Sequence, residues 1–373
     1  GEGKSVVIHF LTASLRHLST TSQVTMGKIV TCCSYLLRFI VVLIAIFFGS
    51  AFLFHWNSPK HSSLIGNPHG NDLAPNFRGE KGEYFKNKDN LWIHYDEYLP
   101  HQNPRDAKGL LLMLHGLDTH AGMYADTAQK IADSTNLIVI TQDHQGWGLS
   151  EGDRLYFEYV SDLRDDFHQL VEMKKKEHNI SKNVFCFGHS FSANLLIWDH
   201  LNGLHSHQPQ LCQGLVLSAL GVVVDPALED FLHGSIGQGL SYLSGFFPKM
   251  IVLKLIGVAE LTSSLPSFHE AWNNDPLVHA FLRLRTSFNF VQILTDNAKN
   301  DVNKVTAPFF LFTGSEDQLV PPASLQSFTA TVASKDKTFK LYEGDYHSVL
   351  HDKHAATAVE DISRWLKQHM SNL

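Results

Sequence analysis

The sequence lacks the features that mark nucleic-acid, nucleotide and metal sites. Its 30 lysines and arginines are outnumbered by 37 acidic residues, and a formal net charge of -7 offers no basic surface to nucleic acid. Its 23 histidines follow no recognisable metal-ligand spacing. The glycine-rich stretch 143–152, DHQGWGLSEG, lacks both the Gly-Lys-Ser/Thr of a phosphate loop and the Rossmann spacing. We therefore expect no nucleic-acid partner, no metal and no cofactor.

Cysteine is scarce. Four cysteines in a chain of 373 residues are too few for a disulfide framework of the kind that holds small secreted domains together. Cys186 and Cys212 fall in predicted buried strands, so we expect them to be inert packing residues. Cys32 and Cys33 precede a long apolar run. If they lie in the cytosol they can be palmitoylated, and unmodified thiols are an equal alternative.

Composition and patterning divide the chain into parts. With 44% hydrophobic and 18% charged residues, the chain can build one large α/β domain with additional segments. The N-terminal segment is residues 1–34, of which residues 1–25 show no core pattern and need not belong to the native protein. Residues 57–82 are rich in Gly, Pro, Asn and Ser and predict a linker, so the folded domain is expected over 83–373.

Residues 35–56 predict a transmembrane signal-anchor helix. Twenty residues, LLRFIVVLIAIFFGSAFLFH, stand between Tyr35 and Trp56, which is about the length that crosses a bilayer core of roughly 30 Å. Two alternatives are a cleaved signal peptide, with Gly49-Ser50-Ala51 as its small-residue site, and a buried core helix. A start at Met26 would give MGKIVT, a short match to an acylation pattern, but we favour a signal-anchor start because a membrane span follows at once.

The positive charges that flank this run predict its orientation. Lys28 and Arg38 lie toward its N-terminal side, whereas Lys60 is the nearby positive residue beyond it. This difference favours a single-pass membrane protein with a cytosolic N-terminus and a lumenal or extracellular folded domain. Asn179-Ile180-Ser181 forms a glycosylation sequon, which has meaning only in that location.

The stretch Val184–Asn194, VFCFGHSFSAN, predicts a nucleophilic serine. VFCF is an apolar run typical of a parallel strand buried on both faces, and the residues after Ser190 predict a helix. The backbone must reverse between them in a strained turn that tolerates only small neighbours, here Gly188 and Ser192. Such a turn exposes the Ser190 hydroxyl and aims the backbone N–H of Phe191 at a developing oxyanion.

Polar residues that follow three other predicted strands complete this site. GLLLML ends in His115-Gly116-Leu117, and the N–H of Leu117 is the expected second oxyanion donor. PFFLFT leads to Asp317 and TFKLYEG leads to His347. Because open α/β sheets place their active sites at the carboxyl ends of the strands, we expect these residues to meet. The order serine, aspartate, histidine along the chain is that of α/β-hydrolases.

Strand and helix alternation lapses over about 221–300. Ile236, Leu240 and Leu243 recur at helical spacing, and Pro248 opens the very apolar segment MIVLKLIG. One interpretation is a set of core-facing helices. We favour a helical lid, partly apolar on its outer side, that would accept an acyl chain or touch a membrane.

A series of motifs follows in order from Glu83 onward: HGL at 115–117, DHQGWGLSEG at 143–152, GHSFS at 188–192, NDPLV at 274–278, GSEDQLV at 314–320 and LYEGDYH at 341–347. With them the chain resembles the monoacylglycerol lipase and lysophospholipase-like branch of the serine α/β-hydrolases, a group of serine aminopeptidase-type hydrolases. The resemblance implies a mostly parallel central sheet flanked by helices. It also implies that Ser190, Asp317 and His347 are catalytic, with Leu117 and Phe191 at the oxyanion hole.

The elbow departs from the family pattern, which is Gly-His-Ser-Met-Gly-Gly. Phe191 replaces methionine, and Ser192-Ala193 replaces both final glycines. A side chain at a point where helix and strand pack closely would strain the turn. We therefore expect activity that is retained but altered.

Together these features predict a serine hydrolase that cleaves carboxylic esters of long-chain acyl groups through an acyl-enzyme. Its substrate would be a lipid ester, a monoacylglycerol or a lysophospholipid, and it would contact the membrane through the span and the lid. Two alternatives remain open. One is a peptidase or small-ester hydrolase on the same fold, and the other is a membrane-tethered binding protein without turnover, suggested by the altered elbow.

Overall fold

The computed structural model describes residues 83–102, 104–117, 119–221, 234–254, 257–299 and 302–371. The predicted N-terminal segment, the signal-anchor helix over 35–56 and the linker all lie outside these described residues. Within them, no helix has both the length and the apolar character needed to cross a bilayer.

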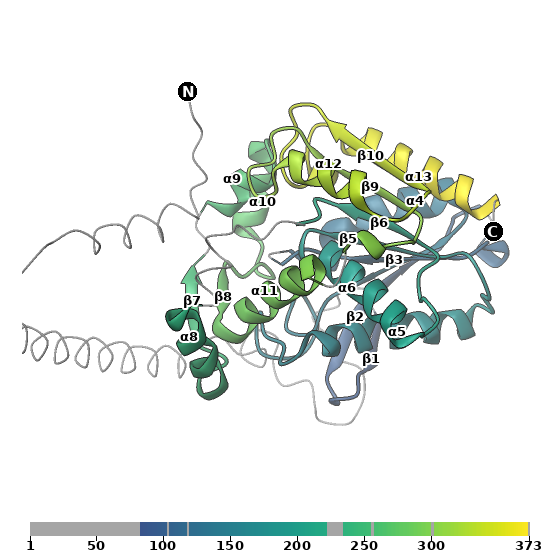
Figure 1. Ribbon diagram of the computed structural model, residues 1–373. Helices are drawn as coiled ribbons and strands as arrows, with labels where there is room; N and C mark the ends of the chain where they lie inside the picture. Colours follow the sequence, from purple (N-terminus) through teal and green to yellow (C-terminus); the bar gives the residue numbers. More distant parts are fainter. Residues whose placement is uncertain are drawn as a thin grey trace, which may run out of the picture. The chain divides into compact units, whose positions relative to one another are not determined.

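The described residues form one large sheet covered by helices (Figure 1). Its spatial strand order is β1 (Glu83–Lys86), β2 (Trp92–Tyr98), β4 (Ile138–Gln142), β3 (Leu110–Leu114), β5 (Val184–His189), β6 (Gly214–Ser218), β9 (Phe309–Gly314) and β10 (Lys337–Tyr342). Strand β2 runs antiparallel to β1 and β4, and the strands from β4 to β10 are parallel. The predicted α/β-hydrolase sheet, mostly parallel, is therefore confirmed.

The central strands are apolar throughout because both of their faces are covered. Every residue of β3, β4, β5, β6 and β9 is buried. The edge strand β10 has exposed and half-buried positions, and its sequence KTFKLY carries two lysines. Burial on both faces explains why the continuous apolar runs GLLLML, VFCF and PFFLFT predicted β3, β5 and β9 correctly.

The two faces of the sheet hold separate hydrophobic cores. Helices α4 (Ala125–Thr135) and α13 (Ala355–Ser371) pack on one face. Helices α5 (Val160–Glu177), α6 (Phe191–Ser206) and α12 (Pro322–Thr331) pack on the other. Short 3-10 helices lie in the connections: η1 (Pro104–Asp106), η2 (Ala121–Tyr124), η3 (Val302–Lys304) and η4 (Val349–His351).

The insertion between β6 and β9 is not purely helical. It contains α8 (Ser235–Phe246), β7 (Ile251–Lys254), α9 (Val258–Thr262), α10 (Pro266–Asn274), β8 (Phe281–Arg283) and α11 (Leu284–Lys299). Strands β7 and β8 pair in antiparallel fashion. The prediction of a helical insertion was therefore wrong for part of MIVLKLIG. Its β-branched residues Ile251 and Val252 suit a strand once a distant partner is available, and only the tertiary structure provides that partner.

Cys186 and Cys212 form a disulfide, with Cα atoms 5.7 Å apart. The prediction that they are inert packing residues was wrong. Cys186 lies in β5 opposite Leu215 of β6, and Cys212 lies two residues before the start of that strand, so strand pairing brings the two thiols together. Helix α6 lies between them in the sequence, and spacing alone gave no indication of the pairing.

Candidate active site

Ser190 occupies a strained turn between β5 and α6. Its backbone has φ 50° and ψ -108°, which is unusual for a residue with a side chain. The residue is the N-cap of α6, so the first backbone N–H groups of that helix lie beside it. Its own N–H donates to Ser218 O at the end of β6, at 2.8 Å. This is the geometry that the sequence predicted for a nucleophile elbow.

The turn depends on the absence of a side chain at Gly188. A Cβ added there would lie 2.6 Å from the carbonyl carbon of Ser192 and 2.7 Å from the nitrogen of Ala193. Both contacts are with backbone atoms of α6, which cannot move aside without shifting the helix. Glycine at this position therefore allows α6 to start directly against β5.

Asp317 and His347 form a buried pair at the carboxyl end of the sheet. Nδ1 of His347 donates to Oδ2 of Asp317 at 2.9 Å, and both side chains are almost fully buried. The Thr313 hydroxyl also donates to this carboxylate, at 2.7 Å. Its other oxygen accepts the backbone N–H groups of Leu319 and Val320, each at 2.9 Å. These bonds fix the carboxylate, and the carboxylate in turn fixes the tautomer and ring plane of His347.

His189 connects this pair to the elbow. Its ring centroid lies 5.1 Å from that of His347, and its backbone directly precedes Ser190. On another side the His189 ring approaches Gly116, where an added Cβ would lie 2.9 Å from the ring. Burial lowers the pKa of His189 well below its ordinary value, so it remains a neutral spacer. The ends of β3, β5 and β10 thus meet around one imidazole.

The loop after β3 is held by hydrogen bonds to its carbonyl groups. Nδ1 of His115 donates to Gly116 O at 2.6 Å, and the Trp147 indole N–H donates to Leu117 O at 2.5 Å. Because a trans peptide points its N–H opposite to its C=O, the first bond turns the Leu117 N–H away from the His115 ring. Burial lowers the pKa of His115 to about 4, so this imidazole is neutral.

Ser192 bridges the elbow helix and the loop after β3. Its hydroxyl donates to His115 O at 2.5 Å and lies 2.8 Å from Nε2 of His144, which then donates to it. The side chain is fully buried. Burial lowers the pKa of His144 well below its ordinary value. The side chain that we expected to strain the turn therefore has room and two hydrogen-bond partners, and it joins the segments that carry Phe191 and Leu117.

The DHQGWGLSEG segment is joined to neighbouring segments through the carboxylate of Asp143. Asp143 accepts the Ala121 N–H at 2.7 Å, the Leu149 N–H at 2.9 Å and Nδ1 of His94 at 2.8 Å. Burial alone would raise the pKa of Asp143, but the His94 hydrogen bond and charge hold it well below its usual range. A Cβ at Gly148 would lie 2.3 Å from the Asp143 carboxylate, which explains a glycine there.

A further ion pair ties the loop after β3 to the insertion. Nε2 of His120 lies 2.9 Å from Oδ2 of Asp275, in the NDPLV motif. Burial opposes protonation of His120, but the Asp275 hydrogen bond and the Asp143 charge raise its pKa above the ordinary value. The pKa of Asp275 is lowered by the same bond, although burial works against it.

One group of described residues has the spacing of a metal site. The ligand atoms of Glu97, Glu177 and His178 lie within 4.8 Å of one another. The ammonium group of Lys174 lies 2.6 Å from Glu97 and 3.0 Å from Glu177. Burial lowers the pKa of Lys174, but its hydrogen bonds to these carboxylates outweigh that effect and raise it. The lysine already supplies the positive charge, so this is an ion-pair cluster.

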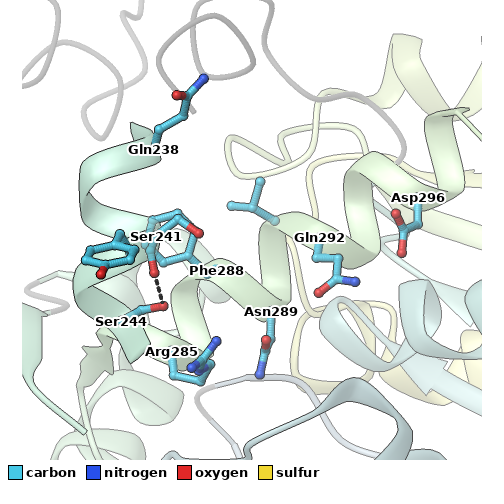
Figure 2. A pocket seen from close by; sticks show the side chains of 10 residues that line it. Gln238, Ser241, Ser244, Arg285, Phe288, Asn289, Gln292 and Asp296 are labelled. Atoms are coloured by element: carbon cyan, nitrogen blue, oxygen red, sulfur yellow. Dashed lines mark hydrogen bonds between the residues drawn. The ribbon is translucent and has the colours of Figure 1, made fainter. Parts of the chain in front are cut away.

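A pocket of about 570 Å³ lies between α8 and α11 (Figure 2). Most of the residues that line it have polar side chains: Gln238, Ser241, Tyr242, Ser244, Arg285, Phe288, Asn289, Val291, Gln292 and Asp296. None of the predicted site residues lines it. This pocket therefore belongs to the insertion and not to the elbow.

The structure joins two of the predicted site residues directly and leaves the remainder as predictions. Asp317 and His347 are hydrogen bonded, and Ser190 follows the histidine that lies against His347. Leu117 and Phe191 lie on the two segments that Ser192 bridges. Sequence reasoning assigned no role to His144 and Trp147, whose contacts join residues 30 or more positions apart. Their inclusion in the DHQGWGLSEG motif was the available signal.

Comparison with protein-family models gives one match that spans most of the folded part. The model described as serine aminopeptidase, S33 (Hydrolase_4) matches residues 105–354. A monoacylglycerol lipase of Mycolicibacterium smegmatis is 27% identical over 278 residues, which cover 74% of this chain and 94% of the lipase. The Homo sapiens monoglyceride lipase is 28% identical over 274 residues, which cover 70% of this chain and 83% of that protein.

Solved structures show the same fold. A crystal structure of Paleococcus ferrophilus monoacylglycerol lipase aligns with a TM-score of 0.61 at 21% identity, and the alignment covers 74% of this chain and 99% of the lipase. A soluble variant of monoglyceride lipase from Saccharomyces cerevisiae, in complex with a substrate analogue, aligns with a TM-score of 0.62 at 20% identity, covering 77% and 94% of the two chains. At these identities the likeness concerns the fold.

Proposed function

This chain belongs to the serine aminopeptidase S33 family of hydrolases, and on that premise we propose that it hydrolyses carboxylic esters of long-chain acyl groups. The substrate class is a monoacylglycerol or a lysophospholipid. The observation that carries the proposal is the buried Asp317–His347 pair, packed through His189 against a strained elbow at Ser190. An exposed or unpaired histidine at this edge of the sheet would not support it.

In the proposed reaction, Nε2 of His347 accepts the proton of Ser190 while the serine Oγ attacks the ester carbonyl. Asp317 holds the imidazole in the tautomer that leaves Nε2 able to accept, and it stabilises the imidazolium that forms. The imidazolium then protonates the leaving alcohol. Water, deprotonated by the same histidine, opens the acyl-enzyme and restores Ser190. The reaction uses no cofactor.

The negative charge that develops on the carbonyl oxygen requires hydrogen-bond donors. We assign that role to the backbone N–H groups of Leu117 and Phe191, and the positive end of the α6 dipole adds to it. Loss of one such donor typically costs about 2.7–4 kcal/mol of barrier. The bonds that orient Leu117, and the Ser192 bridge between the two segments, therefore support the proposal.

The lipid part of the proposal is supported by the insertion over about 221–300, which we propose to be a lid. Its described part exposes several large apolar side chains: Tyr242, Phe246, Val252 and Leu253. Exposed apolar residues gathered in one insertion suit contact with a lipid surface or an acyl chain. The relatives with monoacylglycerol or monoglyceride lipase names agree with this substrate class.

We also propose that the chain is anchored by residues 35–56, with its N-terminus in the cytosol and its hydrolase domain in the lumen or outside the cell. The charges that flank this apolar run support the orientation. The Cys186–Cys212 disulfide supports the compartment, because disulfides persist mainly where the surroundings are oxidising.

A fluorophosphonate probe tests the nucleophile first. Wild-type protein should be labelled and Ser190→Ala should not, whereas Ser192→Ala, two residues away, should still be labelled. A folded wild-type protein that resists the probe would refute the catalytic proposal and favour a membrane-tethered binding protein. Circular dichroism on the same samples verifies that each variant is folded.

A substrate panel then tests the chemical class. Long-chain monoacylglycerols and lysophospholipids should be hydrolysed faster than short-chain esters and aminoacyl amides. Faster cleavage of the aminoacyl amides would overturn the lipid assignment and support a peptidase, while leaving the serine mechanism intact. Ser190→Ala serves as the blank for every substrate, so that spontaneous hydrolysis is subtracted.

A further inference from the structure

Asn179 lies in the turn between α5 and β5, on the surface of the hydrolase domain. Both Asn179 and Ser181 are exposed, while Ile180 between them is half-buried and packs against the core. The backbone at Asn179 has φ 53°, and the Ile180 N–H donates to Lys175 O at 2.8 Å. The two polar residues of the sequon are thus presented to solvent by an ordered turn.

The sequon is unique in the chain. Of all the asparagines in the 373-residue sequence, Asn179 alone is followed by a non-proline residue and then by serine or threonine. A glycan is bulky and needs an acceptor on the protein surface. This sequon falls in an exposed loop.

A disulfide in the same part of the fold gives the second, independent observation. Cys186 lies in β5, the strand that this turn enters, and it is bonded to Cys212. Forming that bond removes two protons and two electrons from the thiols, which a dithiol–disulfide exchange partner must accept. Such partners act in the compartments where asparagine glycosylation also occurs.

We propose that Asn179 carries an N-linked oligosaccharide. In the transfer, the bond between the sugar anomeric carbon and its lipid diphosphate carrier breaks. A bond from that carbon to Nδ2 of Asn179 forms, the amide nitrogen loses one proton, and the lipid diphosphate departs. The inference rests on the proposed lumenal or extracellular placement of the domain and is independent of the catalytic step.

The site is compatible with access to the elbow. Asn179 precedes β5 and Ser190 follows it, so they lie at opposite ends of a six-residue strand. At about 3.3 Å per residue these ends are roughly 20 Å apart. A glycan at Asn179 therefore extends from the amino edge of the sheet, away from the edge where the substrate would bind.

The test is expression of the full chain in a eukaryotic cell, followed by digestion with peptide N-glycosidase. Wild-type protein should gain electrophoretic mobility on digestion. Asn179→Gln and Ser181→Ala should migrate like the digested wild type before any treatment. Ser181→Thr keeps the acceptor motif and should behave like wild type, so it separates loss of the motif from damage to the turn.

The same lysates report the disulfide. Free thiols are blocked with a small maleimide, the protein is reduced, and newly exposed thiols are labelled with a polyethylene-glycol maleimide. Wild-type protein should gain two labels that a Cys186→Ser, Cys212→Ser double variant does not gain.

The two readouts distinguish the ways of failing. A wild-type protein whose mobility is unchanged by the glycosidase overturns the Asn179 assignment. If the disulfide labels are nevertheless found, the proposed placement of the domain stands and only the glycan site is refuted. If they are missing as well, the placement is refuted together with the site. Fluorophosphonate labelling reports on catalysis separately in each case.

Discussion

Two buried aspartate–histidine pairs in this molecule have nearly the same local geometry. Asp143 lies 2.8 Å from Nδ1 of His94, and Asp317 lies 2.9 Å from Nδ1 of His347. Each aspartate follows a central strand, and all four side chains are buried. Their surroundings differ: His94 lies within β2, with Asp96 at 3.7 Å from its Nε2, whereas His347 lies in a loop against the residue that precedes Ser190.

An aspartate–histidine pair alone therefore does not identify a catalytic site. The second pair differs in its neighbour, because the His347 ring lies against His189, the residue that precedes Ser190. Asp143 accepts backbone N–H groups from two loops and so holds them together. We therefore expect changes to the first pair to act on stability and changes to the second to act on turnover.

Asp317→Asn should lower kcat for a long-chain monoacylglycerol by about 10⁴-fold. The asparagine oxygen can still accept the backbone N–H groups of Leu319 and Val320. Its amide nitrogen would then face Nδ1 of His347 and favour the tautomer that cannot accept a proton from Ser190. Steady-state kinetics measures the loss of kcat. The loss of stability, measured by thermal unfolding, should be far smaller than that of Asp143→Asn.

Asp336→Asn is the matched control for that change. Asp336 also pairs with a histidine, with its Oδ2 3.0 Å from Nε2 of His369, but its side chain is 57% exposed. Exposed pairs contribute little to stability, so this variant should retain wild-type kcat. Equal losses in both variants would show that Asp317 has no special role.

Asp143→Asn should reduce the free energy of unfolding by about 3–5 kcal/mol, the range seen when one partner of a buried pair is removed. The asparagine amide has one acceptor oxygen. It can therefore accept from only some of the three donors that the carboxylate binds, which are the Ala121 N–H, the Leu149 N–H and Nδ1 of His94. Urea unfolding at neutral pH measures the change. At a temperature where the variant is folded, its kcat should stay within about tenfold of wild type. A stable variant with the kinetics of Asp317→Asn would abolish the distinction between the pairs.

In a third buried aspartate, Asp166 in α5, no cationic group of the described residues lowers the pKa. Burial raises its pKa to about 8, and the Asn87 amide offsets only part of that effect. The folded state therefore keeps a proton that the unfolded chain releases near its ordinary pKa. The stabilisation from this proton is complete below about pH 4 and is lost as the pH rises through about 8.

Asp166→Asn should remove that pH dependence. The amide resembles the neutral carboxyl group and cannot ionise, so the variant should gain about 2–5 kcal/mol over wild type between pH 5 and pH 9. Urea unfolding across this pH range measures the difference. Parallel stability curves for the two proteins would show that the Asp166 carboxyl is already ionised in the folded state at low pH.

Ser192→Gly, which restores the residue usual in the family, should lower kcat by roughly tenfold and stability by about 1 kcal/mol. The change removes the hydroxyl that joins His115 and His144 across the elbow. Ser206→Ala, on the exposed end of the same helix, is the control and should leave kcat unchanged. Higher activity in Ser192→Gly would instead support our original expectation that the side chain strains the turn.

Much of the fold could be read from the sequence because burial on both faces gives a local signal. The apolar runs behind β3, β5 and β9 predicted these strands within about two residues of their bounds. The elbow could also be predicted, since Gly188 and Ser190 obey a steric requirement that acts within five residues. The order of Ser190, Asp317 and His347 then indicated which strand ends should meet.

The remainder depended on contacts between residues far apart in the chain. The β7–β8 pairing, the Cys186–Cys212 bond and the hydroxyl bridge of Ser192 each require two segments to be placed within a few ångströms, and composition carries no signal for that. The sequence of this protein by itself therefore determined its local steric and burial preferences. The partner of each thiol, carboxylate and imidazole was decided only when the sheet brought its strand ends together.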